Sequence, residues 1–301
     1  KQCAGICEIG VKYITRVVFE KHIVTVMLCQ GIARAIVHID ESIIMTPVIE
    51  LFMECAQQES EPLRLPPSLA LLTSVGPKIH ANHGAELLEL LPKIIDCIDP
   101  NDSFKTIGAA SVIESITLSM EPGKMAWLAG CESDMSMYIW DKLESVLSRY
   151  IDNAHDELHP SDRNVLEFVL TASARFLGVM GTESQGVVLE RLSDFLCDRN
   201  GFVIRKPFKQ FILHYGRSGQ PKGFAVIYKR ILVALLDRLG NCKLERPFED
   251  RCCDQEIWLM HVLAMLTRFS ISSSTPLPEL DTIGTLIANT KNIKIAQAYG
   301  K

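Results

Sequence analysis

The sequence predicts an all-α protein built as an α-solenoid, and three observations predict it. Nearly every long segment repeats apolar residues at spacing i, i+3, i+4 and i+7, which gathers them on one face of a helix. Hydrophobic residues make up 48 % of the chain but aromatic residues only 7 %, which favours helices packed through Leu, Ile, Val and Ala over a β-sandwich. Helices begin roughly every 20 residues, so a helix pair repeats about every 40 residues, as in HEAT and armadillo units.

A single globular bundle of helices is the alternative fold. The chain has 301 residues and few aromatic side chains. A large number of such helices is easier to stack in one dimension than to pack round a single core. We therefore expect residues 1–301 to form one continuous HEAT-like segment, with loop breaks near residues 59–67 and 130–136. Because the chain has no initiator Met and residues 298–301 end inside an apparent helix, we expect a piece of a longer protein.

Helical runs account for most of the sequence. The first two are expected over residues 17–37 and 43–55, and the polar, proline-rich residues 59–67 should form a loop. Short connections rich in Gly, Pro, Asn and Ser, which are turn and cap residues, separate the later runs. In chain order these runs cover residues 87–98, 104–116, 137–151, 164–180, 187–196, 202–215, 224–239, 255–269 and 278–289, with another helix expected to begin at Asn292.

A tight corner is predicted where Asp99-Pro100-Asn101-Asp102 separates two of these runs. Pro100 lacks an N–H and clashes with the preceding turn, so the first helix should end there. Asn101 or Asp102 can accept hydrogen bonds from the unpaired N–H groups at the start of the second helix. The motif therefore predicts two stacked helices joined by a short turn.

Cysteine usage and charge limit the class of protein. The ten cysteines are irregularly spaced, and Cys29, Cys55, Cys97 and Cys197 lie within apolar runs, as expected for reduced, buried thiols of a cytosolic or nuclear protein. The net charge of −5 disfavours non-specific nucleic-acid binding. The chain has no apolar run of about 18 residues that would predict a membrane span.

Several His and Cys clusters are candidate metal ligands. His155 and His159 are four residues apart, but a metalloprotease helix needs Glu directly after the first His, where this chain has Asp156, and Pro160 interrupts the helix. We expect a solvated helix end there, followed by a cap at Ser161 or Asp162. The remaining clusters lack the further ligands of a four-ligand site, and we expect them to be structural; they are His80 with His83, Cys3 with Cys7, and Cys242 with Cys252 and Cys253.

No catalytic residue is predicted. The sequence has neither a phosphate-binding glycine loop nor a nucleophile elbow, so we expect a protein that is not an enzyme. The most basic region could face an acidic partner or a polyanion, but its charges are spread over about two helices with apolar residues between them, so we expect a solvated outer face. It comprises Arg205, Lys206, Lys209, Arg217, Lys222, Lys229 and Arg230.

Two motifs resemble one known family, the very large ATP-independent HEAT-repeat proteasome activators of the proteasome activator complex subunit 4 type, called bleomycin-sensitivity proteins in fungi. The first is Leu91-Pro92, then Ile98-Asp99-Pro100-Asn101-Asp102 and Lys105-Thr106. The second is Asp254-Gln255-Glu256-Ile257-Trp258, followed by Leu259, Leu263, Leu266 and Arg268. Between the motifs, Leu192 and Phe195 retain part of a third pattern. The resemblance covers roughly residues 85–300.

The resemblance implies a dome-like solenoid that caps the 20S proteasome core particle and opens its gate to peptides and unfolded proteins without ATP or ubiquitin. It implies a nuclear and cytoplasmic protein with a link to DNA repair. Family members dock through a C-terminal hydrophobic-Tyr-x tail, which this chain lacks because Tyr299 is third from its end. Inositol phosphates bind elsewhere in family domes, and no matched position in this segment implies a cofactor.

Two other functions remain open. A different HEAT-repeat scaffold, such as a nuclear transport receptor, would present an acidic inner surface to basic cargo, and the net charge of −5 permits this. An enzyme with a metal at His155 and His159 is the third possibility. The partners that each hypothesis predicts, a 20S core particle, a small guanine-nucleotide-binding transport protein or a bound metal, distinguish the three.

Overall fold

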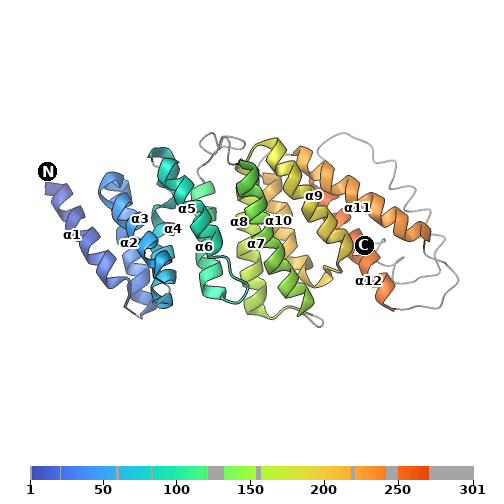
Figure 1. The fold of residues 1–301 in the computed structure, drawn as a ribbon, viewed down its shortest axis with the longest axis horizontal. Helices are drawn as coiled ribbons and strands as arrows, with labels where there is room; N and C mark the ends of the chain where they lie inside the picture. The colour runs from blue at the N-terminus through green and yellow to red at the C-terminus, as the bar shows by residue number, and fades with distance from the viewer. Residues whose placement is uncertain are drawn as a thin grey trace.

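The protein is an elongated stack of helices in the computed structural model (Figure 1). The structure describes residues 2–20, 22–58, 61–82, 84–118, 120, 132–153, 157–217, 221–241 and 250–270. Every regular element within these ranges is helical. The first six α-helices are α1 (Gln2–Val17), α2 (Ile23–Ile39), α3 (Glu41–Gln57), α4 (Leu65–Asn82), α5 (Gly84–Asp96) and α6 (Ser103–Thr117). They are followed by α7 (Glu132–Asp152), α8 (Pro160–Val179), α9 (Thr182–Asp198), α10 (Arg205–Arg217), α11 (Pro221–Asn241) and α12 (Asp250–Ser270), and two short 3₁₀ helices are η1 (Pro62–Arg64) and η3 (Phe202–Ile204).

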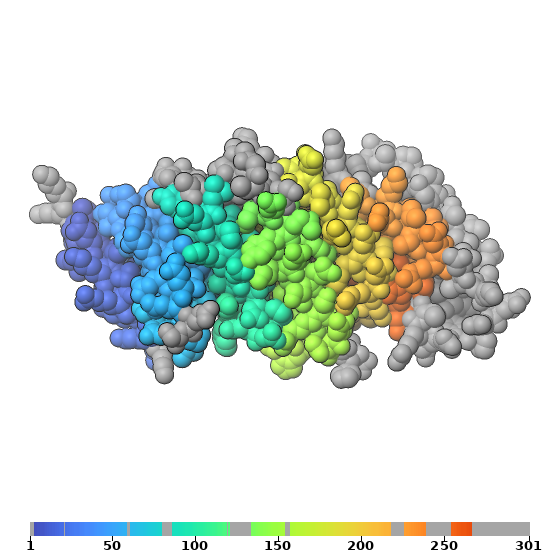
Figure 2. Space-filling model, viewed as in Figure 1, coloured from blue at the N-terminus to red at the C-terminus, as the bar shows by residue number. Residues whose placement is uncertain are grey.

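The helices form two layers. In the even layer, α2, α4, α6, α8, α10 and α12 each pack against the next even-numbered helix. In the odd layer, α1 packs on α3, and α5, α7, α9 and α11 follow one another. Figure 2 shows the consequence, because segments follow one another along the long axis in chain order. Among the described residues, the main helix contacts join near neighbours in sequence, as in an α-solenoid, which confirms the predicted fold class.

The core is a continuous apolar layer between the two helix layers. It extends from α1, where Ile14 is fully buried, to α12, where Trp258 is fully buried. Small residues bring the even-layer helices close together. A Cβ on Gly76 of α4 would lie 2.0 Å from Oγ of Ser115 in α6, and one on Gly108 of α6 would lie 3.1 Å from Cδ1 of Leu69 in α4. A Cβ at Gly76 would therefore force Ser115 to shift, and one at Gly108 would fit only if the Leu69 side chain moved by a few tenths of an ångström.

The predicted corner joins α5 and α6. Asp102 is the N-cap, and its side chain accepts a hydrogen bond from the Lys105 N–H at 3.0 Å. The Asp99 carboxylate accepts a hydrogen bond from the Asn101 N–H at 2.8 Å. Thr106 closes the turn, because its hydroxyl accepts from the Asp99 N–H at 2.9 Å and donates to the Asp99 carbonyl at 2.6 Å. The structure thus assigns the cap to Asp102 and gives Thr106, which the sequence analysis named only as part of a motif, the role of closing the turn.

Several element boundaries differ from those predicted, two of them near the N-terminus. The helix expected over residues 17–37 begins only at Ile23, where α2 starts, and Val17 is instead the last residue of α1, a helix that was not predicted. The loop expected over residues 59–67 is shorter, since η1 occupies residues 62–64 and α4 begins at Leu65. Pro66 and Pro67 lie in the first turn of α4, where an N–H has no helical acceptor, so proline starts this helix instead of breaking it.

The structure also shortens one predicted break, and it leaves two predicted C-terminal helices outside the described residues. Pro77 lies inside α4. The break expected at residues 130–136 ends early, because α7 begins at Glu132. The helices expected over residues 278–289 and from Asn292 lie outside the described residues.

Candidate functional site

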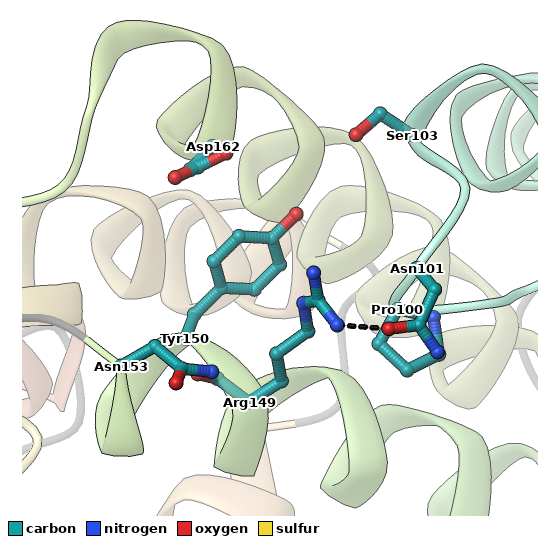
Figure 3. A pocket seen from close by; sticks show the side chains of 7 residues that line it. All are labelled: Pro100, Asn101, Ser103, Arg149, Tyr150, Asn153 and Asp162. Carbon is teal, nitrogen blue, oxygen red and sulfur yellow. Dashed lines mark hydrogen bonds between the residues drawn. The ribbon is translucent and has the colours of Figure 1, made fainter.

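A pocket of about 330 Å³ lies at the corner between α5 and α6 (Figure 3). Three parts of the chain form it: the corner itself, the end of α7 and the start of α8. The corner motif singled out in the sequence therefore lines a cavity as well as joining two helices. The lining residues are Pro100, Asn101, Ser103, Arg149, Tyr150, Asn153 and Asp162.

One wall of the pocket is held by Arg149. Its exposed guanidinium donates a hydrogen bond to Oδ1 of Asn101, drawn as a dashed line in Figure 3. The Asn153 side chain donates a hydrogen bond through Nδ2 to the Arg149 carbonyl at 2.8 Å. This carbonyl lies in the last turn of α7. Since the Asn101 N–H is bound by Asp99, the corner and the end of α7 are fixed to each other through Asn101.

Tyr150 supplies the buried polar group of the pocket. Its ring is buried, and its hydroxyl lies on the side of the pocket where Figure 3 places Ser103 and Asp162. Burial, followed by the Asp162 carboxylate, raises the pKa of Tyr150, and a hydrogen bond with Ser103 opposes the rise. The phenol therefore remains neutral at physiological pH. The described lining offers one cation, one carboxylate and several neutral hydrogen-bonding groups, which suits recognition of a polar group.

Further arginines connect successive helix pairs along the same edge of the stack. Arg199, just after α9, pairs with Asp152 of α7 at 2.8 Å, and Arg205 of α10 pairs with Glu157 before α8 at 3.5 Å. Each arginine reaches back to the preceding helix pair, as Arg149 does. Exposed ion pairs contribute only about 0–1 kcal/mol each. Because each of these ion pairs contributes little to stability, we interpret their role as setting how neighbouring helix pairs align.

The second family-like motif stabilises the end of α9. Gln255 of α12 donates through Nε2 to the carbonyls of Cys197 and Arg199, at 2.8 and 2.9 Å. The Trp258 indole N–H donates to the Leu196 carbonyl at 3.2 Å. The last carbonyls of a helix have no partner within it, so α12 pairs those of α9 from the neighbouring helix. This motif is a packing and capping device.

The candidate metal ligands are only partly described. The cap predicted at Ser161 or Asp162 is wrong: α8 begins at Pro160, and His159 is its N-cap, with Nδ1 accepting a hydrogen bond from the Ser161 N–H and lying 2.7 Å from the Ser161 hydroxyl. Its predicted companion His155 lies outside the described residues, as do His83 and Cys242. The side chains of His80, Cys252 and Cys253 also lie outside them. Among the residues that the structure does describe, no three His, Cys, Asp or Glu side chains form a group that could hold a metal ion.

The described cysteines include the four thiols expected to be buried. Cys29, Cys55, Cys97 and Cys197 are buried and unbridged, whereas Cys3 is exposed and Cys7 is buried. Burial raises the pKa of Cys97 and of Cys197 to about 11. These two thiols are therefore protonated at neutral pH and poorly reactive.

The structure divides the basic region between the two layers. Arg205, Lys206, Lys209 and Arg217 belong to α10 in the even layer, whereas Lys229 and Arg230 belong to α11 in the odd layer. Arg230 is paired with Asp194 of α9 at 2.6 Å. The side chain of Lys222 lies outside the described residues.

Sequence reasoning did not identify most of the pocket. It selected Pro100 and Asn101 as corner residues, but Arg149, Tyr150 and Asp162 lie about fifty or more positions further along the chain. The apolar pattern of α7 shows that Tyr150 faces the core and leaves Arg149 outside. Which corner meets the end of α7 depends on how the helix pairs stack.

Comparison with known proteins adds no family to this description. None of the described helices is both long and apolar enough to cross a membrane. No protein-family model matches the sequence, and no curated protein matches it either.

Proposed function

We propose that this chain is a non-catalytic scaffold segment of a proteasome activator that caps the 20S core particle and opens its gate. Such an activator would admit peptides and unfolded proteins without ATP or ubiquitin. The observation that carries the proposal is the placement of the two motifs that resemble this family. Both lie where helices of one solenoid meet, at the α5–α6 corner and at the contact of α12 with the end of α9.

The stacked architecture supports a scaffold role. A solenoid presents long, continuous surfaces to partners, because each added helix pair extends the same two layers. The corner pocket adds a polar recess with a fixed guanidinium and a neutral phenol. These features favour binding of polypeptide, and the partners proposed are the 20S core particle and its peptide or protein substrates, in the nucleus and cytoplasm. No cofactor is proposed for this segment.

Native isolation tests the proposal. The endogenous protein, tagged and purified from cell extract at low salt, should recover the subunits of the 20S core particle in stoichiometric amounts. The recovered complex should hydrolyse fluorogenic peptides faster than the free core particle. Recovery of a small guanine-nucleotide-binding transport protein without proteasome subunits would favour the transport-receptor alternative and refute the proposal.

The corner motif offers a sharper version of this test. If Asp102 acts through packing, Asp102→Ala should lower the melting temperature and reduce peptidase stimulation only as far as folded protein is lost. A variant that folds normally but no longer stimulates hydrolysis would contradict a purely structural role for the corner.

A further inference from the structure

Helix α10 carries charge of only one sign. Its sequence contains four cations, Arg205, Lys206, Lys209 and Arg217, and no Asp or Glu. Arg205 is neutralised by Glu157 at 3.5 Å. Within the part of the chain that the structure describes, Lys206, Lys209 and Arg217 are exposed and have no ion pair. The charge of α10 is therefore opposite in sign to the net charge of the chain, which is −5.

The three free cations share one face of α10. At 100° per residue, Lys206, Lys209 and Arg217 fall within an arc of about 80°. The opposite side is buried through Phe208, Phe211, Ile212 and Tyr215, where α10 packs against α8. The cations therefore point outward from the even layer. We call this surface the α10 face: Lys206, Lys209, Gln210, Leu213 and Arg217.

The α10 face has a defined length and an apolar centre. A helix rises about 1.5 Å per residue, so Lys206 and Arg217 are separated by roughly 16 Å along the axis. Half-buried Leu213 lies between them. An extended polypeptide advances about 3.3 Å per residue, so about five of its residues span the same distance.

The electrostatics near the Arg217 end of α10 also involve Arg175 and His214. Arg175 of α8 lies beside α10 and is paired with Glu114 of α6 at 3.1 Å. Burial, and then the nearby Arg175 and Arg217, hold the pKa of the half-buried His214 below its usual value. A carboxylate brought to the end of α10 near Arg217 would therefore meet a favourable potential.

We propose that the α10 face docks an extended acidic segment of another polypeptide. Carboxylates at one end of the segment would meet Lys206 and Lys209, a carboxylate at the other end would meet Arg217, and an apolar side chain between them would cover Leu213. This inference goes beyond the proposed activator role and does not depend on it.

The observations favour an acidic protein segment over nucleic acid. Affinity for a nucleic-acid backbone grows with the number of phosphates that Lys and Arg neutralise, and the described α10 face offers only three uncompensated cations. The net charge of −5 and the pI near 5.9 also repel a long polyanion from the rest of the surface. A short acidic run has few charges, so it matches the number of cations present.

Fluorescence anisotropy with the 301-residue protein tests this at low ionic strength. The probe is a labelled peptide with two glutamates, a central leucine and a third glutamate spaced to span the face. Lys209→Glu should weaken its binding roughly fivefold or more, because an attractive exposed pair becomes repulsive. Binding should also weaken as salt is added.

Lys229→Glu is the matched control. Lys229 is also exposed and lies on α11 in the odd layer, and its reversal changes the net charge of the protein by the same amount. The proposal requires this control to bind like the natural protein, and thermal melting followed by circular dichroism checks that both variants fold. Equal weakening by both variants, absence of peptide binding, or tighter binding of a single-stranded oligonucleotide of equal charge would each overturn it.

Discussion

Gly201→Ala should destabilise the protein because Trp258 occupies the space that a side chain would need. An added Cβ would lie 2.6 Å from Cζ2 and 2.7 Å from Cε2 of the Trp258 ring. Carbon atoms in contact prefer about 3.5–4.0 Å, so the ring would have to move by about 1 Å. The ring is fully buried and packs against Phe208 at a centroid distance of 5.9 Å. Little room exists for that movement.

The expected cost has three contributions. Overpacking of a filled core costs about 1–3 kcal/mol. Displacing the ring also weakens the 3.2 Å hydrogen bond from the Trp258 indole to the Leu196 carbonyl, which contributes about 1 kcal/mol. Alanine also restricts the unfolded chain, which offsets about 0.4–1 kcal/mol of this destabilisation. This gain applies because Gly201 has φ of −88°, which alanine adopts without strain. We therefore expect a net loss of about 2 kcal/mol.

Gly186→Ala is the matched control and should have the opposite sign. Gly186 lies inside α9, and a Cβ there would have no neighbour within 4 Å among the surrounding atoms. Replacing glycine in a helix interior should stabilise the protein by about 0.5–1 kcal/mol. Urea denaturation followed by tryptophan fluorescence and circular dichroism measures both changes. A Gly201→Ala protein as stable as the natural one would refute the steric argument.

Three further predictions concern buried polar groups. Gln255→Met should cost about 2 kcal/mol because the Arg199 carbonyl loses its partner, whereas the Cys197 carbonyl keeps its bond to Arg238. Urea denaturation should show no such loss for Gln210→Met, at a half-buried position on the α10 face. Burial raises the pKa of Glu256, whose Oε2 has no hydrogen-bond partner in the described structure. Because the folded-state pKa is raised, the stability that the protonated Glu256 carboxyl contributes is present at acid pH and is lost as pH rises through that pKa. Glu256→Gln should therefore be more stable than the natural protein at pH 8. Urea titrations should show this gain shrinking toward pH 4. Thr106→Val removes both hydrogen bonds to Asp99 and should cost about 1–3 kcal/mol in thermal melts, whereas Thr106→Ser, which keeps the hydroxyl, should lose much less.

The sequence predicted the elements well where a local rule decides the outcome. The corner follows from Pro100 and from a capping residue just before α6, and both act within one turn of the chain. Prolines were misleading elsewhere. Pro66 and Pro67 begin a helix and Pro77 lies within one, since a proline's effect depends on its position in the helix. The break between α1 and α2 has no proline or glycine to signal it.

Residue periodicity alone determined that this chain is a stack of helices with one apolar layer, because side chains three and four positions apart must share a face. Periodicity shows which side of a helix is buried but not which helix covers it. Tertiary structure therefore decided that Arg149 meets Asn101, that Gln255 pairs the end of α9, and that Gly201 lies against Trp258 while Gly186 has open space around it. It also placed Lys209 and Lys229 in different layers, although both belong to the basic region predicted from the sequence.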